Sequence, residues 1–220
     1  MELKGAIFDF DGTLFDSMEI WENAGSEYIK SLGKQPEPGL DEILRPMSLY
    51  DSALYLSKRY GIDKSEREIL IGIADLVEDF YFHKALPKPG IERLLDEMSR
   101  RGVRMAVATA SERHHIEAAL KRCNLDGYFC GIVTCGEVGS GKNEPDTFRK
   151  ALELLKTERS DTLVFEDSYN AVMTSKADGF VTVVVNDRFE RRRKEVEEAA
   201  DYYFEDLEES EEFWRFVLEQ

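Results

Sequence analysis

An apolar strand that runs directly into two carboxylates is the feature that most constrains this chain. Residues 5–8 have the length and character of a buried parallel strand, and Asp9, Asp11 and Gly12 follow at once. Unpaired carboxylates are costly in a core, whereas open α/β sheets bind ligands at the carboxyl ends of their strands. Two acids this close repel each other unless a cation or a shared proton offsets their charge, which indicates Mg²⁺. The alternative is a simple turn, since Asp-Gly is a common turn signal.

The net charge and the cysteine content limit the kinds of molecule that this protein is expected to bind. The net charge is −16, from 29 Lys and Arg against 45 Asp and Glu, which disfavours nucleic acid and anionic membranes but not a small phosphorylated molecule. The three cysteines lack a Cys-x-x-Cys pair, so we expect reduced thiols rather than a zinc site. The absence of a membrane-length apolar run and of room for a signal peptide predicts a soluble, cytoplasmic protein.

The region after the acidic pair reads as helical only. Amphipathic patterns predict helices over 17–32, 40–45, 50–60 and 65–82, and no convincing strand lies between 17 and 85. The sequence Pro87-Lys88-Pro89-Gly90 indicates a rigid return to another domain. We therefore expect a helical cap, residues 16–85, inserted into a core made of residues 1–15 and 86–220.

Strands and helices alternate from Gly90 onward. The predicted strands cover 103–109, 131–134, 162–165, 181–185 and 201–204, and the predicted helices cover 91–101, 112–122, 145–156, 169–177 and 207–219. This alternation is typical of a parallel sheet covered on both faces. The predicted fold class is therefore α/β, a Rossmann-like parallel-sheet core with an inserted all-helical cap domain.

Polar residues end two more of these strands. Thr109 can offer a phosphate its hydroxyl, although the stretch is more simply explained by Ser111 as the cap of a helix that starts at Glu112. Glu166 and Asp167 end the strand over 162–165, where core burial cannot explain two carboxylates unless they are paired.

A glycine-rich loop lies between these strands. Residues 136–142 match the start of a phosphate-binding P-loop, but Asn143 stands where that motif needs Ser or Thr, so we reject the P-loop. Pro145 fits the first residue of a new helix. Without further information, Lys142 is as readily a solvated loop lysine as a functional one.

Taken together, the four stretches resemble the motifs of the haloacid dehalogenase superfamily, and the run from Asp9 to Ser17 resembles its phosphatase and β-phosphoglucomutase-like branch. The resemblance covers essentially the whole chain. It implies that Asp9 is the nucleophile and Asp11 the general acid and base. The remaining roles that it implies are phosphoryl binding by Thr109, Ala110 and Lys142, and Mg²⁺ binding by Asp9, Asp11, Glu166 and Asp167.

The resemblance implies a Mg²⁺-dependent phosphatase that acts on a small phosphorylated metabolite through an aspartyl-phosphate. A β-phosphoglucomutase-type mutase is the alternative within the family. Mutases carry a cap histidine where this chain has Trp21, and a cap arginine where it has Leu49, although Arg45 is close. Ser17, Trp21 and Arg45 are therefore candidate substrate contacts, while the helical spacing of Trp21 fits the core of the cap equally well.

Two other classes of protein, receiver domains and non-catalytic phosphate-binding proteins, fit the sequence less well. Receiver domains of signalling proteins also surround a phosphorylated Asp with carboxylates and Mg²⁺, but the adjacent acidic pair and the helical insertion argue against them. A non-catalytic phospho-acceptor or binding protein would require a missing motif residue, and none is missing.

We expect a monomer or dimer, and surface positions for His83, His114 and His115.

Overall fold

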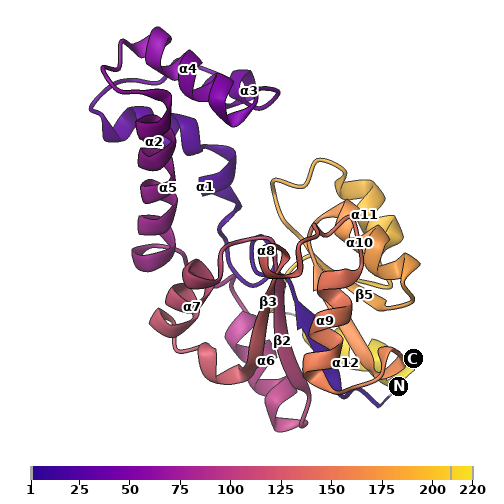
Figure 1. The fold of residues 1–220 in the computed structure, drawn as a ribbon. Helices are drawn as coiled ribbons and strands as arrows, with labels where there is room; N and C mark the ends of the chain where they lie inside the picture. Colours follow the sequence, from indigo (N-terminus) through magenta and orange to yellow (C-terminus); the bar gives the residue numbers. More distant parts are fainter. Residues whose placement is uncertain (1, 209, 220) are drawn as a thin grey trace. The chain divides into compact units, whose positions relative to one another are not determined.

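A six-stranded parallel sheet forms the centre of the larger of two structural units. The computed structural model describes residues 2–208 and 210–219. The strand order is β3-β2-β1-β4-β5-β6, and every pairing is parallel. The strands are β1 (Gly5–Phe8), β2 (Arg104–Thr109), β3 (Phe129–Thr134), β4 (Thr162–Glu166), β5 (Val181–Val185) and β6 (Tyr202–Phe204). The predicted α/β parallel-sheet class is confirmed (Figure 1).

Helices connect the strands. They are α6 (Ile91–Arg100), α7 (Arg113–Arg122), α8 (Cys135–Val138), α9 (Asp146–Leu155), α10 (Tyr169–Ala177), α11 (Arg193–Ala199) and α12 (Ser210–Glu219), with 3₁₀ turns at Asp126–Tyr128 and Arg159–Asp161. The sequence prediction missed α8 and α11, because a four-residue helix and a strongly charged one carry little hydrophobic periodicity. None of the helices in the described residues is both long enough and apolar enough to cross a membrane.

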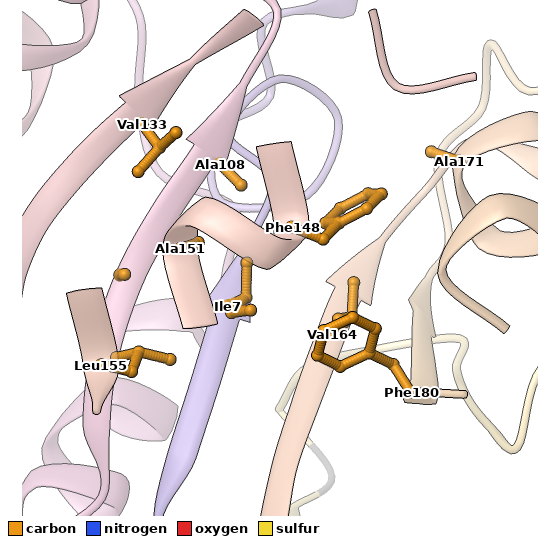
Figure 2. Close-up of a cluster of buried hydrophobic side chains, with 10 residues drawn as sticks. Ile7, Ala108, Val133, Phe148, Ala151, Leu155, Val164, Ala171 and Phe180 are labelled. Atoms are coloured by element: carbon orange, nitrogen blue, oxygen red, sulfur yellow. The ribbon is translucent and has the colours of Figure 1, made fainter. Parts of the chain in front are cut away.

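Consecutive residues of the central strands are buried on opposite faces of the sheet, as the alternation of side chains along a strand requires. Ile7 and Val164 pack in one cluster with Phe148 of α9 (Figure 2). Their neighbours Phe8 and Phe165 stack on each other, and Phe165 meets Phe213 of α12 edge to face. Burial on both faces explains why these strands are continuous apolar runs.

The register brings three strand ends to the same edge of the sheet. Phe8 of β1 pairs with Val107 of β2 on one side and with Phe165 of β4 on the other. Asp9 follows Phe8 directly, so it lies level with Glu166 at the end of β4 and one residue before the end of β2. The parallel register therefore brings the polar residues at the ends of these strands close together.

The second unit spans Ser17–Lys84, and the first comprises Met1–Asp16 with Ala85–Gln220. The helices of the second unit are α1 (Met18–Glu22), α2 (Ala24–Ser31), α3 (Leu40–Leu44), α4 (Leu49–Tyr60) and α5 (Glu66–His83). Its core includes Tyr28, Ile29, Leu56 and Ile69, all buried. A capping box between Ser65 and Glu68 starts α5.

Two details of this helical unit differ from the sequence prediction. The single helix expected over 17–32 is interrupted at Asn23, which separates α1 from α2. The helical spacing predicts that Trp21 lies on the apolar stripe of that helix, but 45% of its surface is exposed. The break shifts the phase of the helix, so the apolar spacing across residue 23 does not describe one continuous face.

The chain leaves and re-enters the first unit through two paired segments. Phe15 forms an antiparallel bridge with Pro87. The backbone N–H of Asp16 donates to the carbonyl of Leu86 at 3.0 Å, and that of Lys88 donates to the carbonyl of Leu14 at 2.9 Å. The two crossings therefore lie side by side.

Candidate active site

Asp9 occupies the end of the central strand β1. Its backbone N–H donates to the carbonyl of Phe165, which continues the pairing with β4. Its side chain is buried, and Oδ1 accepts a hydrogen bond of 2.6 Å from the backbone N–H of Phe10. The strand thus fixes one carboxylate oxygen as well as the backbone of Asp9.

Lys142 lies between two buried carboxylates. Its Nζ forms an ion pair with Oδ1 of Asp9 and donates to Oε1 of Glu166 at 2.6 Å. Burial alone would lower the pKa of this amino group, but the charges of Asp9 and Glu166 outweigh that effect and raise it. The solvated-lysine alternative is therefore wrong, since only 12% of the Lys142 side chain is exposed and its charge is paired.

Asp9, Glu166 and Asp167 form a cluster of three buried carboxylates whose ligand oxygens lie within 4.8 Å of one another. Burial, and next the charge of Glu166, raise the pKa of Asp9 to about 8. Burial and the charge of Asp9 likewise raise the pKa of Asp167 well above its usual range. One lysine does not balance three ionised carboxylates, so in the absence of a cation the raised pKa values favour protonation of Asp9 and Asp167.

These residues fit a divalent cation. Oε2 of Glu166 is buried without a hydrogen-bond partner among residues 2–208 and 210–219. An unsatisfied carboxylate oxygen in a crowded acidic cluster is unfavourable by itself and suits a hard cation such as Mg²⁺. The side chain of Asp11 is not a member of the cluster.

Asp11 lies in the turn that follows β1 and contacts a residue of the neighbouring strand end. Oγ of Ser111 donates a hydrogen bond of 2.5 Å to Oδ2 of Asp11. The expectation that Ser111 caps a helix is wrong: Glu112 occupies the cap position of α7, and no side chain caps it. Sequence reasoning therefore missed the contact of Ser111 with Asp11, whose only signal was a hydroxyl two residues beyond Thr109.

Thr109 shapes the same turn. Its side chain is fully buried, and Oγ1 accepts a hydrogen bond of 3.0 Å from the backbone N–H of Ser111. Ala110, between them, is exposed. Thr13 also contacts the acidic cluster, with Oγ1 3.5 Å from Oδ1 of Asp167.

A second, largely buried ion pair joins Lys88 and Asp187. Nζ of Lys88 is 2.9 Å from Oδ2 of Asp187 and donates to the carbonyl of Asn186 at 2.6 Å. The charge of Asp187 contributes to the raised pKa of Asp167. No periodicity or motif in the sequence predicts this pair, because its members stand 99 residues apart.

The candidate substrate residues of the helical unit are partly brought together. Trp21 and Arg45 line one cavity of about 270 Å³, whereas Ser17 is fully buried at the start of α1 and is not among the lining residues. Nε1 of Trp21 donates to the hydroxyl of Tyr81 at 2.8 Å, and Arg45 forms an ion pair of 2.5 Å with Glu22.

The histidines differ from the expectation at one position. His83 and His114 are exposed, as predicted, but His115 is buried on α7. Its burial follows from its place on the inner face of the helix, next to Ile116 and one turn before Ala119.

The chain matches a known protein family over most of its length. Residues 6–185 match the family described as haloacid dehalogenase-like hydrolase. A candidate pyrophosphatase PpaX from Caldanaerobacter subterraneus subsp. tengcongensis is 28% identical over 212 residues, 94% of this chain and 92% of the relative. Hexitol phosphatase A from Escherichia coli is 29% identical over 188 residues, 84% of each chain.

The solved structures agree at the level of the fold. The structure of a candidate β-phosphoglucomutase from Thermotoga maritima has a TM-score of 0.84 at 22% identity, and the match covers 98% of this chain and 100% of that one. Because the family match spans most of the chain, this protein belongs to the haloacid dehalogenase-like hydrolase family and is an enzyme of that family.

Proposed function

We propose that this protein is a Mg²⁺-dependent phosphatase that hydrolyses a small phosphorylated metabolite through an aspartyl-phosphate intermediate. The observation that carries the proposal is the buried contact of Lys142 with Asp9 and Glu166, beside a carboxylate cluster that suits a divalent cation. The names of the two relatives, a pyrophosphatase and a hexitol phosphatase, support a phosphate substrate.

Asp9 is the proposed nucleophile. Its Oδ1 is already held by Phe10 and Lys142, so we assign the attack on phosphorus to Oδ2. A new bond forms between Oδ2 and phosphorus while the bond from phosphorus to the ester oxygen breaks. The carboxyl group of Asp11 gives its proton to the departing oxygen.

The second half of the reaction returns the enzyme to its starting state. A water molecule attacks phosphorus and loses a proton to the carboxylate of Asp11, and the bond between phosphorus and Asp9 breaks. Inorganic phosphate leaves, with Asp9 ionised and Asp11 protonated. Throughout, the cation of Lys142 and the hydroxyl and N–H groups around Thr109 and Ala110 hold the phosphoryl oxygens, since phosphoryl transfer depends mainly on positioning and electrostatics.

Asp9, Glu166 and Asp167 would hold the Mg²⁺, with the backbone carbonyl of Asp11 as a further proposed ligand. When bound, the ion neutralises charge between the phosphate and these carboxylates. Ser17, Trp21 and Arg45 remain proposed substrate contacts in the helical unit.

The test is phosphate release from a panel of esters, namely sugar phosphates, a hexitol phosphate, phosphoglycolate and pyrophosphate, with Mg²⁺ or with EDTA. We expect Mg²⁺-dependent release that Asp9→Asn lowers by about 10³-fold or more, because the variant lacks the nucleophile. Asp63→Asn, at an exposed position of the helical unit, is the matched control and should retain full activity.

Two outcomes would contradict the proposal. Release by a folded Asp9→Asn variant at the wild-type rate would exclude the aspartyl-phosphate route. Isomerisation of β-glucose 1-phosphate with little free phosphate would identify a mutase instead.

A further inference from the structure

The hydroxyl of Ser111 and the carboxylate of Asp11 belong to residues 100 positions apart that lie within 2.5 Å of each other. Ser111 is 8% exposed, so little water competes for this hydrogen bond. A hydrogen bond to a charged group contributes more than one between neutral groups, and a short one restricts the rotation of both side chains.

Both ends of this hydrogen bond are fixed by their own turns. On one side, Oγ1 of Thr109 accepts from the N–H of Ser111, which holds the residue after β2 in place. On the other side, Leu14 and Phe15 both donate to the carbonyl of Phe10, and Gly12 closes the turn with a φ of +76°. A residue with a Cβ would be strained at that φ, so Gly12 keeps the turn that presents Asp11.

We propose that Ser111 is a positioning residue that holds the carboxyl group of Asp11 in the orientation needed for proton transfer to the departing oxygen. The inference rests on the proposed function, because it concerns the group that acts there as acid and base. A carboxyl oxygen can accept a hydroxyl whether or not the group carries a proton, so the contact of Ser111 with Oδ2 is compatible with both halves of the reaction.

This role predicts a dependence on the leaving group. A poor leaving group, such as an aliphatic alcohol, requires a well-placed proton donor, whereas p-nitrophenolate leaves with little protonation. Without the hydroxyl, Asp11 samples other orientations, and misplacement of a catalytic group lowers the rate of the step it serves. The step that needs the acid should therefore slow more than the same step with an activated ester.

The experiment measures kcat/KM of the wild type and Ser111→Ala with two substrates in Mg²⁺. One is p-nitrophenyl phosphate, and the other is the aliphatic ester that the wild type hydrolyses fastest in the panel above. The ratio kcat/KM includes departure of the alcohol and excludes the later hydrolysis of the aspartyl-phosphate, so it isolates the relevant step. Ser175→Ala is the matched control, because it removes a fully buried hydroxyl that donates to the carbonyl of Val172 on α10.

We expect Ser111→Ala to lower kcat/KM at least about tenfold for the aliphatic ester and less than about threefold for p-nitrophenyl phosphate. Asp11→Asn should show the same selectivity more strongly, and Ser175→Ala should leave both values unchanged. An equal loss with both esters would overturn the inference in favour of direct phosphate binding by Ser111, and no loss with either would also overturn it. If the folded wild type released phosphate from no ester, the proposed function would fail, and the role of Ser111 with it.

Discussion

The amino group of Lys142 lies 2.6 Å from Oε1 of Glu166, while Oε2 of the same carboxylate is buried without a hydrogen-bond partner in the described part of the chain. One lysine thus serves the nucleophile and a proposed metal ligand together. This arrangement links the charge balance of the site to the stability of the fold.

Replacing Lys142 with Met should destabilise the metal-free protein by about 3–5 kcal/mol, because it leaves buried carboxylates without their cation. Phosphatase activity should fall by about 10²-fold or more, since the same cation faces the phosphoryl group. Urea unfolding in EDTA measures the first effect. Lys150→Met on α9, where the lysine is exposed, is the control. Equal stability of the two variants would show that Lys142 does not balance the buried charge.

Asp167→Asn should separate stability from metal binding. The variant removes a buried charge, so the metal-free protein should be as stable as the wild type or up to about 1 kcal/mol more stable. The rise in Tm that Mg²⁺ produces in the wild type should be lost with its ligand. Thermal unfolding with and without Mg²⁺ tests both effects. A variant that Mg²⁺ still stabilises fully would remove Asp167 from the metal site.

Lys88 and Asp187 form a buried pair in which removal of one partner should be worse than removal of both. Lys88→Met alone should lower the free energy of unfolding by about 3–5 kcal/mol, because Asp187 is then buried and unpaired. Lys88→Met combined with Asp187→Leu should recover a large part of that loss. A double-mutant cycle from urea unfolding supplies the coupling energy. Strictly additive effects would mean that the two residues do not stabilise each other.

Asp201 should contribute a pH-dependent part of the stability in acid. Burial opposes ionisation, but Lys176 and the N–H and hydroxyl of Thr182 outweigh it and lower the pKa of Asp201 below 3.8. Since the folded-state pKa is lowered, the stabilisation is present above the unfolded-state pKa and is lost as the pH falls through the folded-state value. Asp201→Asn should therefore unfold with a weaker dependence on pH below about 4. Unfolding curves at several acidic pH values test this, with Asp63→Asn as control; parallel pH profiles of wild type and Asp201→Asn would refute it.

The sequence predicted most of the fold because its signals are local. Apolar runs such as residues 162–165 and the alternation of strands with helices depend on near neighbours. The break at Asn23 and the half-exposed Trp21 were missed for the opposite reason. They depend on how α1 and α2 pack with other helices, which a stripe of apolar residues does not specify.

The residues of the candidate site were predicted or missed for the same reasons. Asp9 and Asp167 follow strands directly and Glu166 ends one, so strand ends together with the family resemblance were enough to predict that they meet. The contacts of Ser111 with Asp11 and of Lys88 with Asp187 join loops distant in sequence. Ser111 had a local explanation as a helix cap, and no sequence pattern pointed to the pairing of Lys88 with Asp187. Only the folded chain reveals these partners.

The backbone pairing at Phe15–Pro87 and Asp16–Leu86 holds the two ends of the inserted residues 17–84 next to each other. The chain segments at these ends are joined by backbone hydrogen bonds, so a connection that replaced the insertion would span no more than the distance between two strands of a β-hairpin. A two-residue turn in place of the helical unit leaves every pairing of the six strands, and the cluster of Asp9, Glu166 and Asp167, within an unbroken chain. Loop closure of so short a connection costs less entropy than closure around 68 residues. The helical segment therefore joins the catalytic scaffold at one place, where a change in its length leaves the pairing of the six strands unaltered.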